Sequence, residues 1–355
     1  MKKFLLILGV NVFILNNCSY NDLDNYNLKT QSSNNNLYIH TNEQEISYKP
    51  KYLHFAHGHI KNTRLQQHPW PFKPLSIAHN IASYQNYGSG AYFHHGIDIR
   101  ADAGTSVYAS AGGLVVNIEN YVSGSPLYWE VAILDDDGFL WQYHHIDKKS
   151  IPSQVWNAYK NSTPIPAGTK IGTIYYWPIS SYGEMFHHIH LNVIGENKKY
   201  ITPILLLEPL NDTQYPQFID VGIIKNQTKW NSNTVYGQYS IYAKIHDLMM
   251  HKYFVVPPYL IQYSINDAEW QTVWKFDELP SENNTTDYIY DFYLYSMSCG
   301  NYTCRSLTIN LGFNKNGNQQ FPVSPGEYNI KIKAQDFANN TTYFDYNWKV
   351  IEEPK

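Results

Sequence analysis

Residues 187–194 read His-His-Ile-His-Leu-Asn-Val-Ile, and this short segment decides how the chain is interpreted. Side chains alternate between the two faces of a β-strand, so His188 and His190 point to one face while Ile189 packs into the other. Two imidazoles on one face, about 7 Å apart, can share a metal ion and its bound water. The segment therefore predicts a strand with a metal-binding face.

Earlier segments add further groups of the same chemistry. Residues 94–98 read His-His-Gly-Ile-Asp, where Gly96 allows a backbone bend that brings a histidine and a carboxylate to one point. Residues 143–146 read Tyr-His-His-Ile. Two histidines and one aspartate would leave the fourth coordination position of a zinc ion open, which is typical of a catalytic zinc site rather than a structural one. A single H-x-H is weak evidence, but three such segments in order are much harder to obtain by chance.

The order H-x-G-x-D, G-T-x-V-x-A, G-x-V, Y-x-H and H-x-H-L resembles the lysostaphin-like zinc endopeptidases, family twenty-three of the metallopeptidases. Those enzymes cut peptide cross-bridges of bacterial peptidoglycan. The similarity covers residues 94–207. It implies one zinc ion held by His94, Asp98 and His190, and two catalytic histidines, His145 and His188. By the same alignment, the neighbouring histidines are not ligands: His95, His144 and His187.

Two departures from the family pattern concern substrate preference more than metal binding. Leu191 and Asn192 stand where the family usually has an aromatic residue and a glutamate. Residues 176–186 lack the usual Gly/Thr/Ser-rich run before H-x-H. The fold that the resemblance implies is a largely antiparallel sheet with the site in a groove on its concave face.

Three functions are compatible with these motifs. The first is an exported endopeptidase acting on peptidoglycan peptides through a zinc-activated water. The sequence does not indicate which of the two catalytic histidines acts as the general base. The second is a non-catalytic peptidoglycan-binding or amidase-activator module of the same fold. Such relatives lose ligands, whereas all five positions are occupied here, which favours the enzyme. The third, an adhesin that binds through the C-terminal part, rests on fold analogy alone.

The remaining pattern predicts a mainly β protein in two parts, a peptidase domain at 49–210 and an Ig-like antiparallel β-sandwich at 211–355. Strand-like segments lie at 107–118, 129–134, 140–145 and 188–194, with a hairpin turn at 135–138 and helical turns at 155–159 or 204–207. Residues 237–243 and 326–332 resemble each other and lead to Asp247 and Asp336. Residues 336–340 predict the turn before the last strand.

The N-terminus has the features of an export signal: a basic start at 1–3 and an apolar run at 4–15. Its end resembles a bacterial lipobox, so residues 1–18 are expected to be the export signal of a lipoprotein. A lipid on Cys18 would anchor the protein to the cell envelope, in the periplasm or at the outer membrane. Ordinary cleavage and secretion are the alternative. Residues 19–48 predict an Asn-rich tether, and Cys299 and Cys304 could close a small disulfide.

Composition excludes one class of partner. The net charge is −4, which argues against a basic surface for nucleic acid, while 43% hydrophobic residues permit a large core. The 32 tyrosines suit half-buried strands. Aromatic residues at 70–72 and 84–88 either line a substrate groove or pack beneath the sheet. A second histidine group at 54–59 is expected to lie on the surface. The oligomeric state is not indicated.

Overall fold

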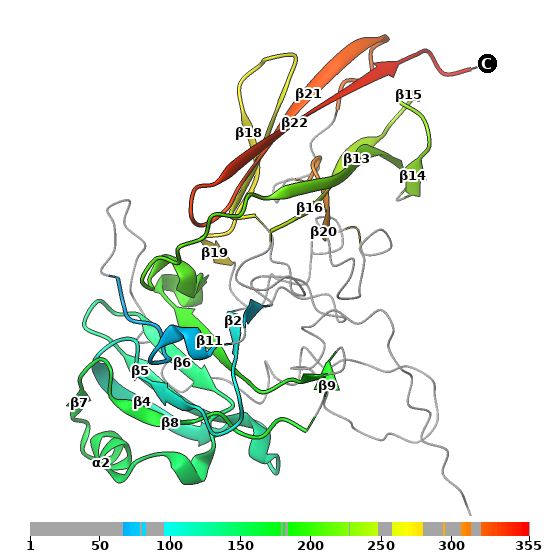
Figure 1. The fold of residues 1–355 in the computed structure, drawn as a ribbon. Helices are drawn as coiled ribbons and strands as arrows, with labels where there is room; N and C mark the ends of the chain where they lie inside the picture. The colour runs from blue at the N-terminus through cyan, green and yellow to red at the C-terminus, as the bar shows by residue number, and fades with distance from the viewer. Residues whose placement is uncertain are drawn as a thin grey trace, which may run out of the picture.

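A computed structural model describes residues 67–78, 80–82, 96–178, 180–181, 184–226, 228–247, 258–279, 294, 307–313 and 321–354. The described chain consists mainly of antiparallel strands, which confirms the predicted fold class (Figure 1). The export signal, the tether, the three cysteines, the histidines at 54–59, residues 84–88, His94 and His95 lie outside the described residues. No helix among the described residues is long and apolar enough to cross a membrane.

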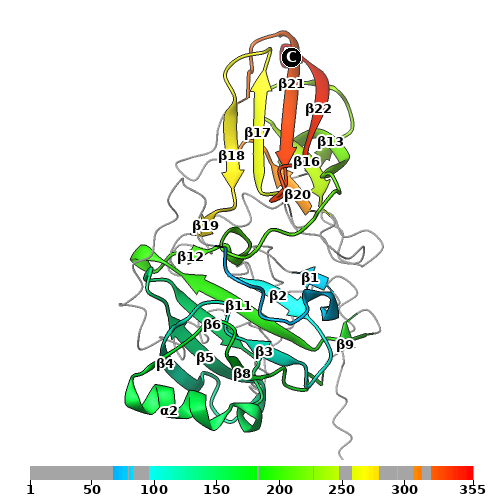
Figure 2. The ribbon, with the colours of Figure 1, turned by 60° about the vertical axis from the view of Figure 1, so that its left-hand side comes forward.

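The N-terminal part is built on one sheet in the order β1-β2-β11-β6-β5-β4-β7, in which all neighbours are antiparallel (Figure 2). Its strands are β1 (Asn80–Ala82), β2 (Ile97–Arg100), β4 (Gly113–Asn120), β5 (Trp129–Leu134), β6 (Leu140–His144), β7 (Pro164–Ile165) and β11 (His188–Ile194). Two small pairs accompany it, β3 (Ser106–Tyr108) with β8 (Lys170–Thr173), and β9 (Ser180–Ser181) with β10 (Glu184–Met185).

The predicted strand at 107–118 is wrong as one element. Residues Ser106–Tyr108 pair with β8, whereas Gly113–Asn120 pair with β5, so the chain changes sheets between residues 109 and 112. The amino-acid composition of this segment is typical of β-strands throughout. It forms two strands because its two ends pair with different partners.

Helical structure is short in the described part of the chain. The predicted turn at 155–159 lies inside α2 (Ser153–Asn161), which buries Val155 and Ala158 and packs against β4. Its left-handed cap residue, Ser162, ends the helix. The other predicted turn overlaps η7 (Pro203–Leu205). The remaining 3-10 helices are η3 (Leu75–Ile77), η4 (Pro126–Tyr128), η5 (Lys148–Ser150) and η6 (Glu196–Lys198).

The hairpin between β5 and β6 is confirmed, and Asp135 organises it. One carboxylate oxygen accepts from the Phe139 N–H at 2.8 Å and the other from the Trp141 indole N–H at 2.8 Å. Trp70 and Phe72 are 4% and 2% exposed and belong to the hydrophobic core, so the packing interpretation holds for residues 70–72.

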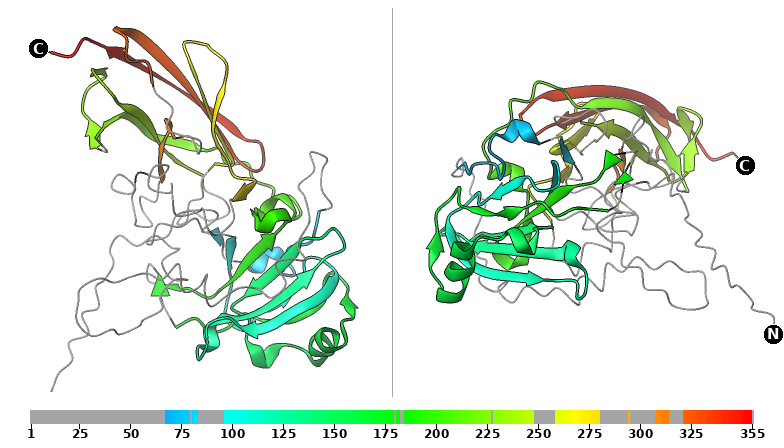
Figure 3. Two further views of the ribbon diagram at one scale, coloured as in Figure 1. Left: turned by 180° about the vertical axis from the view of Figure 1, so that it is seen from behind. Right: turned by 60° about the horizontal axis from the view of Figure 1, so that its bottom comes forward.

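The C-terminal part has two sheets, ordered β14-β13-β16-β20 and β15-β22-β21-β17-β18, which lie in two layers in Figure 3. The strands of the first are β13 (Gln217–Lys225), β14 (Thr228–Trp230), β16 (Ser240–His246) and β20 (Leu307–Asn310); those of the second are β15 (Thr234–Val235), β17 (Leu260–Ile265), β18 (Gln271–Lys275), β21 (Gly326–Gln335) and β22 (Thr341–Val350). Only β15 and β22 are parallel among the described pairs. The Ig-like identity of this part stays a prediction.

The two similar segments fall in different sheets of this part. The alternation predicted for 326–332 is observed in β21, where Ile330 and Ile332 are fully buried, and residues 336–340 form the turn before β22. Each segment leads to a buried aspartate, and carboxylate oxygens of Asp247, Asp336 and Asp212 lie within 4.8 Å of one another. Burial raises the pKa of Asp336, while hydrogen bonds from Asn340 oppose the rise.

A short strand joins the two parts. β12 (Tyr200–Ile201) pairs with β11 on one side and with β19 (Glu278–Leu279) on the other. Beside it, Thr202 is fully buried, and both of its donors are hydrogen-bonded. Its N–H donates to the Asp277 carbonyl at 3.0 Å and its hydroxyl to the Phe276 carbonyl at 2.6 Å. The N-terminal sheet and the C-terminal part therefore share one hydrogen-bonded edge, although the boundary near residue 210 remains a prediction.

Candidate active site

The strand register gathers four polar side chains from distant parts of the sequence. Asp98 in β2 lies opposite His190 in β11, His190 lies opposite His144 in β6, and His144 lies opposite Glu130 in β5. Directly opposed residues project to the same face of a sheet. Asp98, His144 and Glu130 are at most 3% exposed. The result is a row of polar groups across four strands.

At one end of this row, two predicted metal ligands converge. Asp98 Oδ1 lies 2.9 Å from His190 Nδ1 and 4.0 Å from His188 Nε2. A carboxylate oxygen and an imidazole nitrogen are donors that zinc accepts, and here they face one point. The described residues therefore fit a zinc ion, and the third predicted ligand, His94, lies outside them.

The chain bends at Gly96, as predicted, but the bend is not what requires a glycine there, because φ at this residue is not positive. A Cβ at this position would instead lie closer than 3.0 Å to the Leu191 carbonyl group and to Asn192 Oδ1. The glycine is needed because β11 approaches the backbone of residue 96 too closely for a side chain.

The two predicted catalytic histidines, His145 and His188, stand side by side with ring centroids 4.6 Å apart. His145 Nδ1 lies 2.9 Å from the Leu127 carbonyl, and His188 Nδ1 lies 2.8 Å from the Phe186 carbonyl. A carbonyl oxygen only accepts, so each Nδ1 carries a proton. In each neutral ring, Nε2 is then the nitrogen that can take up a proton.

His145 reaches this site because the strand ends before it. β6 stops at His144, one residue short of the predicted end, and His145 has φ 64, in the left-handed region. This conformation breaks the alternation that would send consecutive side chains to opposite faces. The rings of His144 and His145 therefore lie on the same side, 6.3 Å apart.

Aromatic side chains enclose these histidines. The Trp177 ring lies 4.6 Å from that of His145 and 5.1 Å from that of His188, and the Phe186 ring lies 4.2 Å from that of His188. Both aromatic residues are almost fully buried. They come from the segment that departs from the family pattern, where buried aromatic packing replaces the expected small polar residues.

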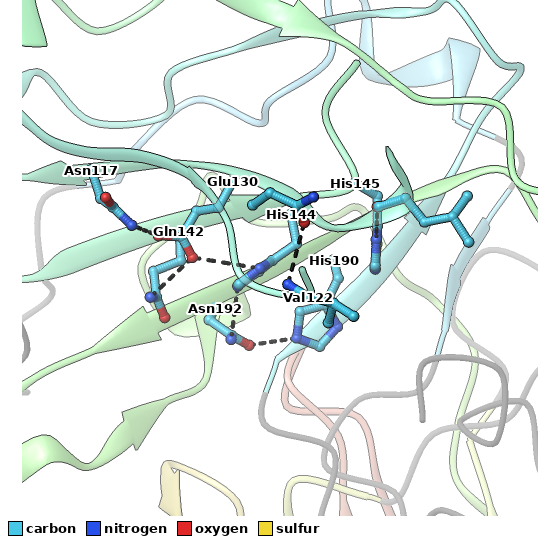
Figure 4. Close-up of polar contacts among 10 residues, drawn as sticks. Asn117, Val122, Glu130, Gln142, His144, His145, His190 and Asn192 are labelled. Atoms are coloured by element: carbon cyan, nitrogen blue, oxygen red, sulfur yellow. Dashed lines mark hydrogen bonds and ion pairs between the residues drawn. The ribbon is translucent and has the colours of Figure 1, made fainter. Parts of the chain in front are cut away.

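Sequence reasoning missed a polar group behind the predicted ligands (Figure 4). His190 Nε2 lies 2.7 Å from Asn192 Oδ1, and Asn192 Nδ2 lies 3.3 Å from His144 Nε2. His144 Nδ1 lies 3.5 Å from Glu130 Oε2. The available signal was polarity at positions that β periodicity places in the sheet: Asn117, Glu130, Gln142, His144 and Asn192. His187 instead accepts from the Trp177 N–H at 3.0 Å, outside this group.

Comparison with known proteins finds one family match, in the part of the chain that carries these residues. Residues 92–203 match the model of peptidase family M23. Among solved structures, a putative peptidase M23 from Pseudomonas aeruginosa is 18% identical with a TM-score of 0.31, covering 48% of this chain and 61% of that one. The catalytic domain of lysostaphin from Staphylococcus simulans is 21% identical with a TM-score of 0.26, covering 36% and 86%. A zinc containing peptidase from Vibrio cholerae is 16% identical with a TM-score of 0.25, covering 36% and 37%.

This chain thus spans less than two thirds of the length of the Pseudomonas aeruginosa protein. None of the curated proteins compared with it matches. The matched range contains all five predicted site positions, from His94 to His190. The segment 92–203 of this chain is a domain of peptidase family M23.

Proposed function

We propose that this protein is a zinc-dependent endopeptidase that hydrolyses peptide bonds in the cross-bridges of peptidoglycan. The observation that carries the proposal is the convergence of Asp98 and His190 beside His145 and His188, inside a peptidase family M23 domain. A ligand pair next to two proton-transferring histidines is the arrangement that metal-assisted hydrolysis requires.

The zinc ion would be held by His94, Asp98 and His190. When bound, zinc lowers the pKa of a water molecule toward 7 and polarises the scissile carbonyl. The burial of Asp98 keeps bulk water from its carboxylate, which strengthens the electrostatic attraction for a cation. His190 presents Nδ1 toward Asp98 because its Nε2 is engaged by Asn192.

His145 and His188 supply proton transfer. Both hold their Nδ1 protons on backbone carbonyls, which fixes the orientation of each ring and leaves Nε2 for exchange with water or with the leaving amine. The buried rings of Trp177 and Phe186 restrict the rotation of these imidazoles. Two equivalent proton carriers allow one to accept the water proton while the other protonates the leaving nitrogen.

Metal analysis together with digestion of cross-linked muropeptides tests this function. We expect one zinc per chain and release of cleaved cross-bridge peptides. His190→Ala is expected to lose both zinc and hydrolysis, whereas His188→Ala should keep zinc and lose about 10²–10⁴-fold in kcat. One zinc per chain without cleavage of any wall preparation would contradict the enzyme and support a non-catalytic peptidoglycan-binding module.

We further propose that the protein is exported and held at the cell envelope by a lipid on Cys18. The basic and apolar segments at 1–15 and the cysteine at 18 support this location. Cys18→Ser should release the protein from the membrane fraction. Unchanged fractionation of that variant would contradict the lipid anchor and leave the peptidase proposal intact.

A further inference from the structure

A buried arginine lies on the same face of the sheet as the candidate active site. Arg100 in β2 is directly opposite His188 in β11, just as Asp98 is opposite His190. Directly opposed residues project to the same face, so these four side chains share it. Arg100 is 4% exposed. Burying a charged side chain is costly unless specific partners compensate for the loss of water, so the contacts of this guanidinium group indicate what it does.

The guanidinium group contacts the segment that leads into β11. Arg100 Nη2 donates to the Met185 carbonyl at 2.9 Å. The guanidinium carbon lies 5.6 Å from the centroid of the Phe186 ring, within the range of a cation–π contact. Arginine can make both contacts at once because its planar group carries several donors and also stacks on aromatic faces. One side chain of β2 therefore holds two consecutive residues of the segment.

This segment has little regular structure of its own. Met185 belongs to β10, which has two residues and pairs with the two residues of β9. A pair of such short strands is at most marginally stable by itself. The backbone bond from the Ala101 N–H to the His187 carbonyl is long, at 3.3 Å. Side-chain contacts with β2, such as those of Arg100, are therefore needed to fix the place of Phe186.

Phe186 connects Arg100 to one of the two predicted catalytic histidines. Its ring is fully buried and lies 4.2 Å from the His188 ring, and its carbonyl oxygen lies 2.8 Å from His188 Nδ1. Both contacts move with the backbone that Arg100 holds. We propose that Arg100 is a positioning residue, which fixes Met185 and Phe186 and through Phe186 sets the orientation of the His188 imidazole.

The first experiment measures hydrolysis, and it rests on the role of His188 in the proposed function. Proton transfer requires groups within hydrogen-bond reach, and Arg100→Met removes the guanidinium group while keeping a long side chain. This variant should lower kcat about 10–100-fold, keep KM within about twofold and retain one zinc per chain, because a misplaced group slows the reaction without weakening binding. An unchanged kcat, with or without a raised KM, would overturn the proposal.

Arg100→Lys covers the case in which Arg100→Met does not fold. It keeps the positive charge but lacks the planar surface that covers Phe186, so its kcat should fall as well. A Lys variant with the kcat of the unaltered protein would show that charge alone is required and would overturn positioning through Phe186.

The second experiment does not depend on hydrolysis. It records the ring C–H signals of histidine in ¹H–¹³C NMR spectra of the metal-free full-length protein at one fixed pH, with His188 assigned through His188→Gln. An aromatic ring shifts the resonances of protons packed against it, so Arg100→Met should move the His188 signals and leave those of His246 in the C-terminal part in place. Unmoved His188 signals would overturn the proposal. If these signals move but the unaltered protein hydrolyses nothing, the proposed function fails and the positioning by Arg100 stands.

A matched control and a double variant separate positioning from general stability. Ile99→Val removes one carbon from the adjacent, fully buried residue of β2, whose side chain points to the opposite face. It should lower the unfolding midpoint but keep kcat within about twofold and leave the His188 signals in place. Arg100→Met combined with Phe186→Leu should lose no more kcat than the more severe single variant, because both act through one contact. Fully additive losses would overturn the proposal.

Discussion

Replacing Gly96 by alanine tests how the site depends on close approach between β2 and β11. An added Cβ would lie closer than 3.0 Å to the Leu191 carbonyl oxygen and to Asn192 Oδ1, and 2.8 Å from the Leu191 carbonyl carbon. The obstruction is largely backbone, which cannot move aside without shifting β11. Overpacking in a core costs about 1–3 kcal/mol, and a backbone obstruction belongs at the upper end of that range.

The same change should damage metal binding beyond its effect on stability. Asn192 Oδ1 is the atom that accepts from His190 Nε2, and Leu191 lies directly between the two residues in the chain. Displacing β11 therefore misplaces His190 relative to Asp98. We expect zinc affinity to fall at least about 10-fold, as for the loss of a hydrogen-bond partner to a metal ligand.

Gly104→Ala provides the control. Gly104 has φ +84, and no atom lies within 4 Å of an added Cβ, so the cost is backbone strain of about 1–2 kcal/mol without collision. Denaturant unfolding of the metal-free protein and zinc competition are measured for both variants. Gly96→Ala should lose stability and zinc affinity, and Gly104→Ala stability alone. A Gly96→Ala protein with normal zinc affinity would refute the reasoning.

Four further outcomes are expected. Tyr143→Phe deprives the buried Ser110 N–H of its acceptor at 2.7 Å and should cost about 1–3 kcal/mol in the free energy of unfolding, measured by denaturant titration. Thr202→Val removes the hydrogen bond from the hydroxyl to the Phe276 carbonyl and should lower the free energy of unfolding by about 1 kcal/mol. An unchanged denaturation midpoint would argue against the edge shared by the N-terminal sheet and the C-terminal part. Burial lowers the pKa of His246, so just below pH 6.5 the unfolded chain binds a proton that the folded protein does not. The free energy of unfolding, measured by denaturant titration, should therefore fall as the pH drops below about 6.5, and this fall should be smaller in His246→Gln. Chelation should stop hydrolysis and lower the melting temperature, and added zinc should restore both, because a ligand of the native state stabilises it.

Local patterns predicted much of the fold. The strands at 129–134 and 188–194 have the predicted bounds, and the turns at 135–138 and 336–340 lie where polar residues and glycine interrupt apolar alternation. These features depend on neighbours in the chain, so periodicity reveals them. The strand predicted at 107–118 failed because two different partner strands divide it, which is a property of the sheets and not of the segment.

The predicted site residues were found through motifs, and the supporting residues were not. Asp98, His145, His188 and His190 stand in recognisable short patterns. Glu130 does not, since a glutamate within a strand-like segment is an ordinary solvent-facing residue when considered alone. Asn192 was noticed only as a departure from the family pattern, without a role. Their role depends on being buried and opposed across the sheet.

The amino-acid sequence by itself determined a mainly β chain, the strand that carries His188 and His190 on one face, and the chemistry of a metal site. Only the tertiary structure decided that positions 98, 190, 144 and 130 form one row, and that His145 leaves the strand alternation to join them. The physical reason is register. Alternation within a strand is local, but the pairing of strands separated by tens of residues is set by the packing of the whole sheet and its core.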